Sequence, residues 1–328
     1  MIDLEAALAE APEEDSLART AVAHRAAHLL RPPGSLHRLD EIAGWLGAWQ
    51  RTDTPVVEAP VLLIAAGDHG VAAHRVSALR PDVTVATIDA IRAGASTSTV
   101  LAASLGASVR LVDVGAGRPT EDIVTEDAMS IDRCESSFQE GRDAVATMKT
   151  DLLLVGDIGV GSTTAAAALC VALFGGEPAG WVGRGSGIDD EALERKVEAV
   201  ASAAGRVGRV TPFEALRRLG GAEMAALAGA VYEARLRSVP VVLDGFVTTA
   251  AAAVLESSTV GALGHTLAGH VSFDPGHRRL LAELSMEPVL DVDVALGEGT
   301  GALLALPIVR AAAFAVSDVA TVDEWGLR

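Results

Sequence analysis

The stretch GDIGVGSTT, residues 156–164, has the composition of a turn that binds a phosphate group. Its glycines are Gly156, Gly159 and Gly161, and its hydroxyl residues are Ser162, Thr163 and Thr164. At a helix N-terminus the backbone N–H groups point outward and the macrodipole favours an anion, and hydroxyl groups add further donors. The stretch is not a Walker A loop, because no lysine follows the last glycine, and it does not fit G-x-G-x-x-G. By itself it predicts an anion site or, equally, an ordinary N-capped βα turn.

A second glycine-rich loop, GRGSGIDD, occupies residues 183–190 and includes Gly185 and Ser186. It precedes a predicted helix that carries Lys196 within its first two turns, and two such loops could bind the two ends of one ligand. A lysine side chain is long enough to reach back to a phosphate from that position. The alternatives are that Asp189 and Asp190 simply cap the helix and that Lys196 lies on a solvated helix face.

Glu298 lies between Gly297 and Gly299, directly before an apolar segment. Apolar neighbours and limited access to water raise the pKa of a carboxyl group, which suits a general base near neutral pH. The alternative is a carboxylate that favourably faces the N-terminal dipole of the following helix.

The other reactive residue types do not form a recognisable site. The spacings of His265, His270 and His277 match no usual zinc pattern, so we expect no metal, and the sequence implies no cofactor. The two cysteines, Cys134 and Cys170, form no C-x-x-C pair, which favours a reducing compartment and a cytoplasmic protein. No G-x-S-x-G motif supports acyl-enzyme chemistry.

The charge balance excludes one class of partner. The chain has 26 basic and 44 acidic residues and a formal net charge of −18, whereas nucleic-acid binding needs a basic surface. The acidic N-terminal residues do not resemble a secretory signal. We expect no membrane-spanning segment, because the apolar run after Gly301 is interrupted by Pro307 and Arg310.

The elements that would position these residues follow a βα alternation. Continuous apolar runs begin at Val61, Val109, Asp151 and Val239, and the predicted helices cover residues 83–105, 190–207, 212–235 and 300–316. Strands without polar alternation indicate a parallel sheet that is buried on both faces. We therefore predict an α/β fold: a doubly wound, mostly parallel sheet of Rossmann-like βα units with a smaller helical lobe. Ligands bind beyond the carboxyl ends of such strands, where the candidates are Asp68, His69, Asp113, Asp157 and Asp244.

The domain organisation is predicted from composition shifts. We expect residues 1–58 to form an N-terminal helical lobe, residues 59–300 the α/β domain that carries the candidate site, and residues 301–328 C-terminal helices that pack on the lobe. No glycine- or serine-rich linker marks these boundaries.

Seven motifs in order along nearly the whole chain resemble one family, the nicotinate-nucleotide:dimethylbenzimidazole phosphoribosyltransferases. They are RPPGSLHRLDEIAGWL from Arg31, AGDHGV from Ala66, GDIGVGSTTAAAAL from Gly156, GRGSG from Gly183, VLDGF from Val242, DPGHR from Asp274 and LGEGTGA from Leu296. This resemblance implies transfer of ribose phosphate from nicotinate mononucleotide to a benzimidazole nitrogen, with inversion at the anomeric carbon and release of nicotinate. The pyridinium leaving group is already activated, so the reaction needs neither pyrophosphate nor Mg²⁺.

The resemblance also implies roles for particular residues and a homodimer. Glu298 matches the family's general base. The residues matching its nucleotide-binding elements are Asp157, Gly159, Gly161, Ser162, Thr163, Gly185, Ser186 and Lys196, and those matching its base-binding positions are Arg80, Ile88, Leu296 and Asp244.

The chain departs from the family at several of these positions. The family usually has Glu at Asp157 and often Asn at Ser162, so a direct nucleotide contact could be replaced by one through water. Arg80 and Ile88 stand where some members have small or amide side chains, which leaves another azole, a purine or a phenol open as acceptor. Two other functions stay open: a non-catalytic nucleotide-binding homologue, and a nucleotide-dependent oxidoreductase that lacks its expected dinucleotide motif.

Overall fold

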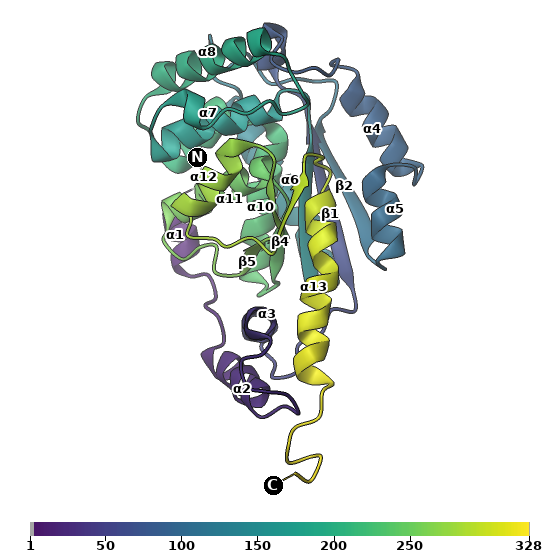
Figure 1. Ribbon diagram of the computed structural model, residues 1–328. Helices are drawn as coiled ribbons and strands as arrows, with labels where there is room; N and C mark the ends of the chain where they lie inside the picture. Colours follow the sequence, from purple (N-terminus) through teal and green to yellow (C-terminus); the bar gives the residue numbers. More distant parts are fainter. Residues whose placement is uncertain (1–2, 328) are drawn as a thin grey trace.

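The structure, a computed structural model, describes residues 3–327, and its centre is a parallel β-sheet (Figure 1). The strands are β1 (Pro60–Gly67), β2 (Ser108–Gly115), β3 (Leu152–Ile158), β4 (Val241–Leu243) and β5 (Thr266–Ala268). They lie in the order β2-β1-β3-β4-β5, and every neighbouring pair is parallel. A second, two-stranded parallel sheet joins β6 (His270–Ser272) to β7 (Leu290–Val294). The predicted doubly wound α/β fold is confirmed.

Alternate side chains of β1 enter two different hydrophobic cores, one on each face of the sheet. Leu63 and Ala65 belong to the first core, whereas Leu62, Ile64 and Ala66 belong to the second. Successive side chains of a strand point to opposite faces, so a strand covered by helices on both sides must be apolar throughout. This explains the continuous apolar runs in the sequence.

Helices cover both faces. The first core includes residues of α6 (Ile131–Ala146), α7 (Ser162–Phe174), α8 (Asp190–Val207), α9 (Pro212–Leu219), α10 (Ala222–Leu236) and α11 (Phe246–Ser258). The second includes residues of α2 (Ser16–Ala27), α3 (His37–Gln50), α4 (Val83–Arg92), α5 (Thr97–Ser104) and α13 (Thr300–Ser317). A side chain on Gly141 of α6 or Gly229 of α10 would collide with the backbone of the other helix. This close approach explains why small residues dominate these helices.

Two of the predicted long helices are broken in the structure. Residues 83–105 form α4 and α5, separated by Gly94 with φ +72° and by Ser96, whose side chain accepts a hydrogen bond from the backbone of Thr99. Residues 212–235 form α9 and α10, separated by Gly220 and Gly221. The prediction of one helix in each stretch was wrong, because glycine and an N-capping serine end one helix and start the next.

Helix α13 continues through Pro307, so the prediction that this proline interrupts the apolar run was wrong. By length and composition α13 is apolar enough to cross a membrane, but 56% of it is buried inside the protein. Its buried side chains include Leu303, Leu306 and Val309 of the second core. Packing in the core therefore accounts for its hydrophobicity.

The two ends of the chain meet around α2, α3 and α13. The Arg25 guanidinium donates to the backbone carbonyl of Val316 at 2.8 Å, and Leu29 forms an isolated β-bridge with Thr321. By contrast, α1 (Leu4–Ala9) buries Leu4 and Leu8 in the first core. The lobe boundaries stay a prediction.

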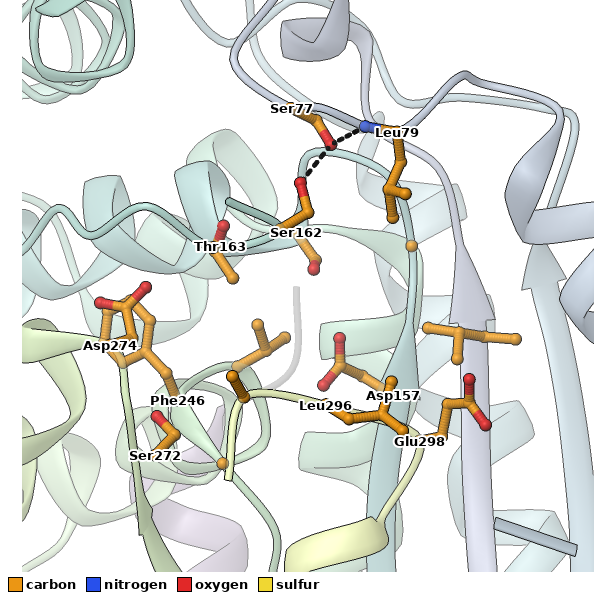
Figure 2. Close-up of a pocket in the computed structure, with 18 of the residues that line it drawn as sticks. Ser77, Leu79, Asp157, Ser162, Thr163, Phe246, Ser272, Asp274, Leu296 and Glu298 are labelled. Carbon is orange, nitrogen blue, oxygen red and sulfur yellow. Dashed lines mark hydrogen bonds between the residues drawn. The ribbon is translucent and has the colours of Figure 1, made fainter. Parts of the chain in front are cut away.

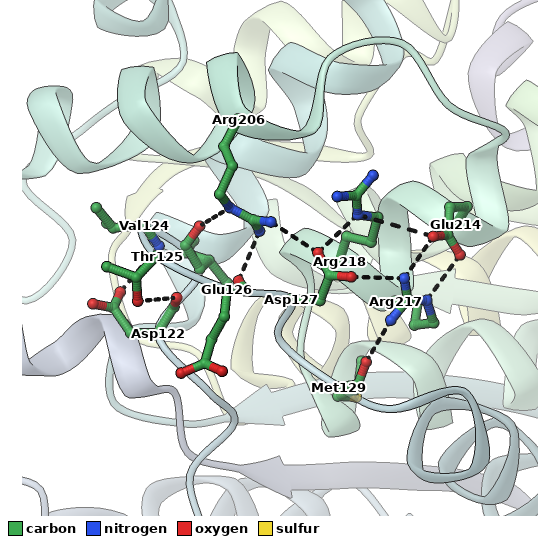
Figure 3. Close-up of polar contacts among 11 residues, drawn as sticks. Asp122, Val124, Thr125, Glu126, Asp127, Met129, Arg206, Glu214, Arg217 and Arg218 are labelled. Carbon is green, nitrogen blue, oxygen red and sulfur yellow. Dashed lines mark hydrogen bonds and ion pairs between the residues drawn. The ribbon is translucent and has the colours of Figure 1, made fainter.

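A polar cluster, which we call the arginine network, fixes the connection between β2 and α6 (Figure 3). It consists of Asp127, Arg206, Glu214, Arg217 and Arg218. Asp127 lies in the connection, Arg206 on α8, and the other three on α9. Asp127 accepts hydrogen bonds from all three arginines at 2.7–2.9 Å. The network ties a long surface segment to two helices.

Candidate active site

A cavity of about 410 Å³ opens at the carboxyl edge of the central sheet (Figure 2). Its lining comes from the ends of β3 and β4, the β6 and β7 segments, and the loops at residues 76–87 and 185–186. Of the sequence-predicted site residues, it includes Asp157, Gly159, Gly161, Ser162, Thr163, Gly185, Ser186, Asp244, Leu296 and Glu298. A cavity of this size suits a small organic ligand, and its position is where open α/β sheets bind one.

The turn between β3 and α7 presents an open helix N-terminus to the cavity. Gly161 is the N-cap of α7, with φ +97°, and no side chain caps the helix. A Cβ on Gly159 would collide with the carbonyl oxygen of Gly67, so the close passage of the turn over β1 requires glycine there. The cavity-lining Ser162 and Thr163 occupy the first helical turn. Such a turn can bind an anion through backbone N–H groups and hydroxyls.

Lys196 lies behind this turn and is not on a solvated face. It is 1% exposed, and its Nζ donates to Thr163 Oγ1 at 2.8 Å and to the carbonyl oxygen of Gly183 at 2.9 Å. A Cβ on Gly185 would approach both Thr163 and Lys196, so the second glycine-rich loop meets the first here. Burial lowers the pKa of Lys196 to about 8, against the attraction of Asp274. An ammonium group has three donors, which leaves one for a ligand.

Glu298 is held in the left-handed region, with φ +66°, at the end of a loop that crosses β3. Its backbone N–H donates to the carbonyl oxygen of Asp157 at 3.0 Å. A Cβ on Gly156 would collide with the backbone of Gly299, so a glycine in β3 permits this approach. Burial raises the pKa of the half-buried Glu298 carboxyl group, Asp244 adds to the effect, and a hydrogen bond from Ser98 opposes it. A carboxyl group with a raised pKa is suited to accept a proton.

Asp244 follows β4 and uses its carboxylate to hold the start of α13. It accepts hydrogen bonds from the backbone N–H groups of Gly299 at 3.0 Å, Gly301 at 2.7 Å and Ala302 at 3.1 Å. His270 Nε2 lies 3.4 Å from the same carboxylate. Asp244 borders the cavity and its oxygens bind the backbone around Glu298, so its predicted part in base binding stays a prediction. The N-terminus of α13 is thus occupied, whereas that of α7 is not.

Asp157 is the most perturbed carboxyl group of the cavity. Burial, followed by the nearby carboxylates of Glu223 and Asp244, raises its pKa to about 8, against a hydrogen bond from Ser162. Glu223 pairs with His69 at 2.8 Å, and both side chains are wholly inaccessible. Burial opposes the charged form of His69, but the Glu223 carboxylate outweighs it and raises the pKa of His69. Sequence analysis named His69 as a strand-end candidate and did not find Glu223, because a glutamate inside an alanine-rich helix carries no local signal.

Two predicted base-binding residues lie outside the cavity lining. The Arg80 side chain is 83% exposed and pairs with Asp82, and Ile88 is 2% exposed in the second core. Within the same segment, the residues that line the cavity are Ser77, Leu79, Val83, Thr84 and Thr87. Val83 and Thr87 are one helical turn apart on α4, whereas Ile88 and Ile91 belong to the second core. The helical period decides which side chains of α4 face the cavity and which are buried, and its phase depends on the residue at which α4 begins.

Of the three histidines that invited a metal hypothesis, His270 and His277 lie with their ring centroids 6.0 Å apart, but each ring has other polar neighbours. His265 Nε2 lies 3.0 Å from the carbonyl oxygen of Val231, and His277 Nε2 lies 3.1 Å from Thr249 Oγ1. Within residues 3–327, no three His, Cys, Asp or Glu side chains gather in a way that could hold a metal ion. Asp274, quoted in the sequence only as part of DPGHR, lines the cavity, caps α12 (Pro275–Glu283) and keeps one buried carboxylate oxygen unpaired.

Comparisons with known proteins agree with this geometry. A phosphoribosyltransferase family profile matches residues 11–327. The chain belongs to this family. It is 44% identical over 97% of its length to a protein of Methylorubrum extorquens, of which it covers 93%, and 44% identical over 96% to one of Cereibacter sphaeroides, of which it covers 94%. Both are named nicotinate-nucleotide–dimethylbenzimidazole phosphoribosyltransferase.

The fold agrees as well. The crystal structure of CobT from Thermus thermophilus superimposes with a TM-score of 0.91 and 37% sequence identity, covering 95% of this chain and 99% of that one. The chain is therefore an enzyme of the phosphoribosyltransferase family with the fold of its solved relative.

Proposed function

We propose that this enzyme transfers ribose 5-phosphate from nicotinate mononucleotide to 5,6-dimethylbenzimidazole, giving α-ribazole 5'-phosphate and nicotinate. The names of its relatives supply the substrates. The observation that carries the proposal is that one cavity contains both an uncapped helix N-terminus, at Ser162, and a carboxyl group with a raised pKa, at Glu298. The first suits a phosphate and the second suits a proton acceptor.

In the proposed reaction the phosphate binds at the N-terminus of α7, with the third donor of Lys196 behind Thr163. Apolar side chains such as Leu79, Phe246 and Leu296 pack against the flat acceptor. One acceptor nitrogen attacks the anomeric carbon from the side opposite the pyridinium, which inverts that centre. The bond to nicotinate breaks and its electron pair returns to the pyridine ring. Glu298 takes the N–H proton from the other acceptor nitrogen, so the azole product stays neutral.

The decisive experiment is release of nicotinate from nicotinate mononucleotide and dimethylbenzimidazole in a buffer with EDTA, with the product resolved by chromatography. Glu298→Gln keeps the size of the side chain but removes its basicity, and we expect it to lower kcat by about 10²–10⁴-fold while nucleotide still binds. Glu287→Gln, at an exposed glutamate, is the matched control. Full activity of Glu298→Gln would remove Glu298 from its role, and absence of turnover in the wild type would leave the non-catalytic homologue.

The acceptor is tested in the same assay with other benzimidazoles, purines and phenols. An apolar cavity discriminates weakly between flat rings of similar size, so we expect dimethylbenzimidazole to lead and related azoles to follow within about 100-fold. A phenol or purine that is used faster would reassign the acceptor and keep the chemistry.

We further propose a cytoplasmic homodimer. The outward face of α13 carries Leu304, Ile308 and Phe314, which are 39%, 36% and 55% exposed in the single chain. An apolar stripe of this kind on one helix favours contact with a second copy. Sedimentation at micromolar concentration tests this: a dimer in the wild type that dissociates in Phe314→Glu supports it, and a monomeric wild type contradicts it.

A further inference from the structure

The N-terminus of α5 has a serine- and threonine-rich sequence that the proposed chemistry does not use. Ser96, Thr97, Ser98 and Thr99 open this helix, and Ser96 is its N-cap. The Ser98 side chain is fully buried, at 0% exposure, and does not line the cavity. Nevertheless its Oγ donates a hydrogen bond of 3.1 Å to Glu298 Oε2, from an element 200 residues away in the chain.

In the hydrogen bonds around Ser98, the donor and the acceptor of each hydroxyl contact can be assigned consistently. Ser98 Oγ gives its only proton to Glu298, so in the contact of 2.9 Å with Ser96 Oγ it must accept. Ser96 Oγ therefore donates to Ser98 and itself accepts the backbone N–H of Thr99 at 3.2 Å. Thr99 Oγ1 gives its proton to the carbonyl oxygen of Ser96. The chain of donors ends on the Glu298 carboxylate.

The Glu298 carboxylate also interacts with the backbone at the N-terminus of α5. Ser98 is the second residue of α5, and its backbone N–H also bonds to Glu298. A carboxylate at a helix N-terminus is stabilised by the free N–H groups and by the macrodipole. Glu298 thus supplies a second acceptor at the N-terminus of α5, beside the N-cap Ser96 and from another part of the chain.

The charged groups near Glu298 come from other elements than α5, and of these Asp244 acts against Ser98. Asp157 comes from the end of β3 and Asp244 from the end of β4, with His270 of β6 against Asp244, and α5 itself carries no charged residue. Burial and Asp244 disfavour the ionised form of Glu298, whereas Ser98 favours it. Near neutral pH the balance between these effects decides how much of the base is ready to accept a proton.

We propose that Ser98 is a positioning residue for the general base: its buried hydroxyl holds Oε2 of Glu298 and so orients the carboxylate to take the acceptor's proton. The inference rests on the proposed role of Glu298. In this proposal two elements form the base: the loop before α13 supplies the carboxylate, and α5 supplies its hydrogen-bond donor.

The test is the pH profile of kcat for Ser98→Ala, with Ser98→Thr as the conservative variant. Loss of the donor raises the pKa of Glu298, so the acidic limb of the profile should move up by about 0.5–1 pH unit, and kcat at a pH on that limb should fall by about 3- to 10-fold. The KM for nicotinate mononucleotide should stay unchanged, because Ser98 does not reach the cavity. Ser98→Thr keeps the hydroxyl and should restore the wild-type limb.

Ser104→Ala is the matched control, because Ser104 is an exposed serine of the same helix whose hydroxyl bonds only to the carbonyl oxygen of Leu101. It should leave the profile unchanged. A Ser98→Ala profile that coincides with the wild type, or that falls equally at every pH, would overturn the inference. If Ser98→Thr does not fold, the Ser98→Ala limb still decides. Failure of the proposed function is seen separately, as absence of turnover in the wild type, and failure of the role of Glu298 as full activity of Glu298→Gln.

Discussion

Two groups of carboxylates in this enzyme lie in opposite electrostatic surroundings. The carboxylate floor of the cavity consists of Asp157, Asp244 and Glu298 (Figure 2). The arginine network binds Asp127 and Glu214 to three guanidinium groups (Figure 3). In the floor, burial and neighbouring carboxylates raise the pKa of Asp157 and Glu298. In the network, burial alone would raise the pKa of Asp127, but hydrogen bonds from the arginines outweigh it and hold the pKa well below its usual range.

The difference shows where the fold gains stability and where it places chemistry. Paired carboxylates such as Asp127 hold a surface segment in place and are charged at any working pH. Like charges gathered in a cavity cost folding free energy, but they provide groups that change protonation near neutral pH, which acid–base chemistry requires. The predictions below test this contrast.

After Glu298→Gln itself, the largest expected effect is on catalysis, from Asp244→Asn. An amide nitrogen cannot accept the backbone hydrogen bonds that Asp244 receives at the start of α13, so the Glu298 loop loses its fixed position. We expect kcat to fall by about 100-fold, measured in the nicotinate-release assay. Asp291→Asn, at an exposed aspartate, should have wild-type activity. Equal activity of the two variants would show that the floor does not position the base.

The next effect is on stability, from Asp127→Ala. Removal of the acceptor shared by three arginines should lower the free energy of unfolding by about 2 kcal/mol at pH 7, measured by urea denaturation. Because the folded-state pKa of Asp127 is lowered, its stabilisation is present above the unfolded value near 4 and is lost as pH falls through the folded value. The loss should therefore shrink in acid. A loss of kcat in the folded variant would instead link the network to the site.

Asp157→Asn should change the free energy of unfolding in the opposite direction, because it should stabilise the protein at high pH. The folded-state pKa of Asp157 is raised to about 8, so its contribution is fully present below about pH 4 and is lost as pH rises towards 8. The asparagine variant stays neutral, and its free energy of unfolding at pH 9 should exceed that of the wild type by about 1 kcal/mol or more. At pH 4 the two proteins should be equal. Denaturation curves at pH 4, 7 and 9 test this, and destabilisation at pH 9 would contradict it.

The smallest effect is expected from Arg80→Ala. Arg80 belongs neither to the carboxylate floor nor to the arginine network. Its ion pair with Asp82 is exposed to solvent, and exposed ion pairs contribute little to stability. The free energy of unfolding should change by less than about 0.5 kcal/mol. The KM for the acceptor should change by less than about 2-fold, which corresponds to the same free energy. A clear rise in the acceptor KM would return Arg80 to the base-binding role that its sequence position suggested.

Much of the fold and part of the site were predictable because their signals are local. The apolar runs gave the four principal strands, and Asp189 marks the start of α8, where its side chain accepts the N–H of Ala192 at 2.8 Å. The strands β5, β6 and β7 were not found, since each includes polar residues and none is a continuous apolar run. The site residues that were missed, such as Thr87 and Asp274, carry no motif of their own.

The sequence by itself determined the glycine-rich turn at Gly159–Thr163, the position of Glu298 between two glycines, and the family that these motifs resemble, because each depends on residues adjacent in the chain. Only the tertiary structure decided what surrounds them. It placed Ser98 against Glu298, the Asp244 carboxylate on the backbone of α13, and Ile88 in the core instead of the cavity. Burial and through-space charge set the pKa of each carboxyl group, and both depend on elements that meet only after folding.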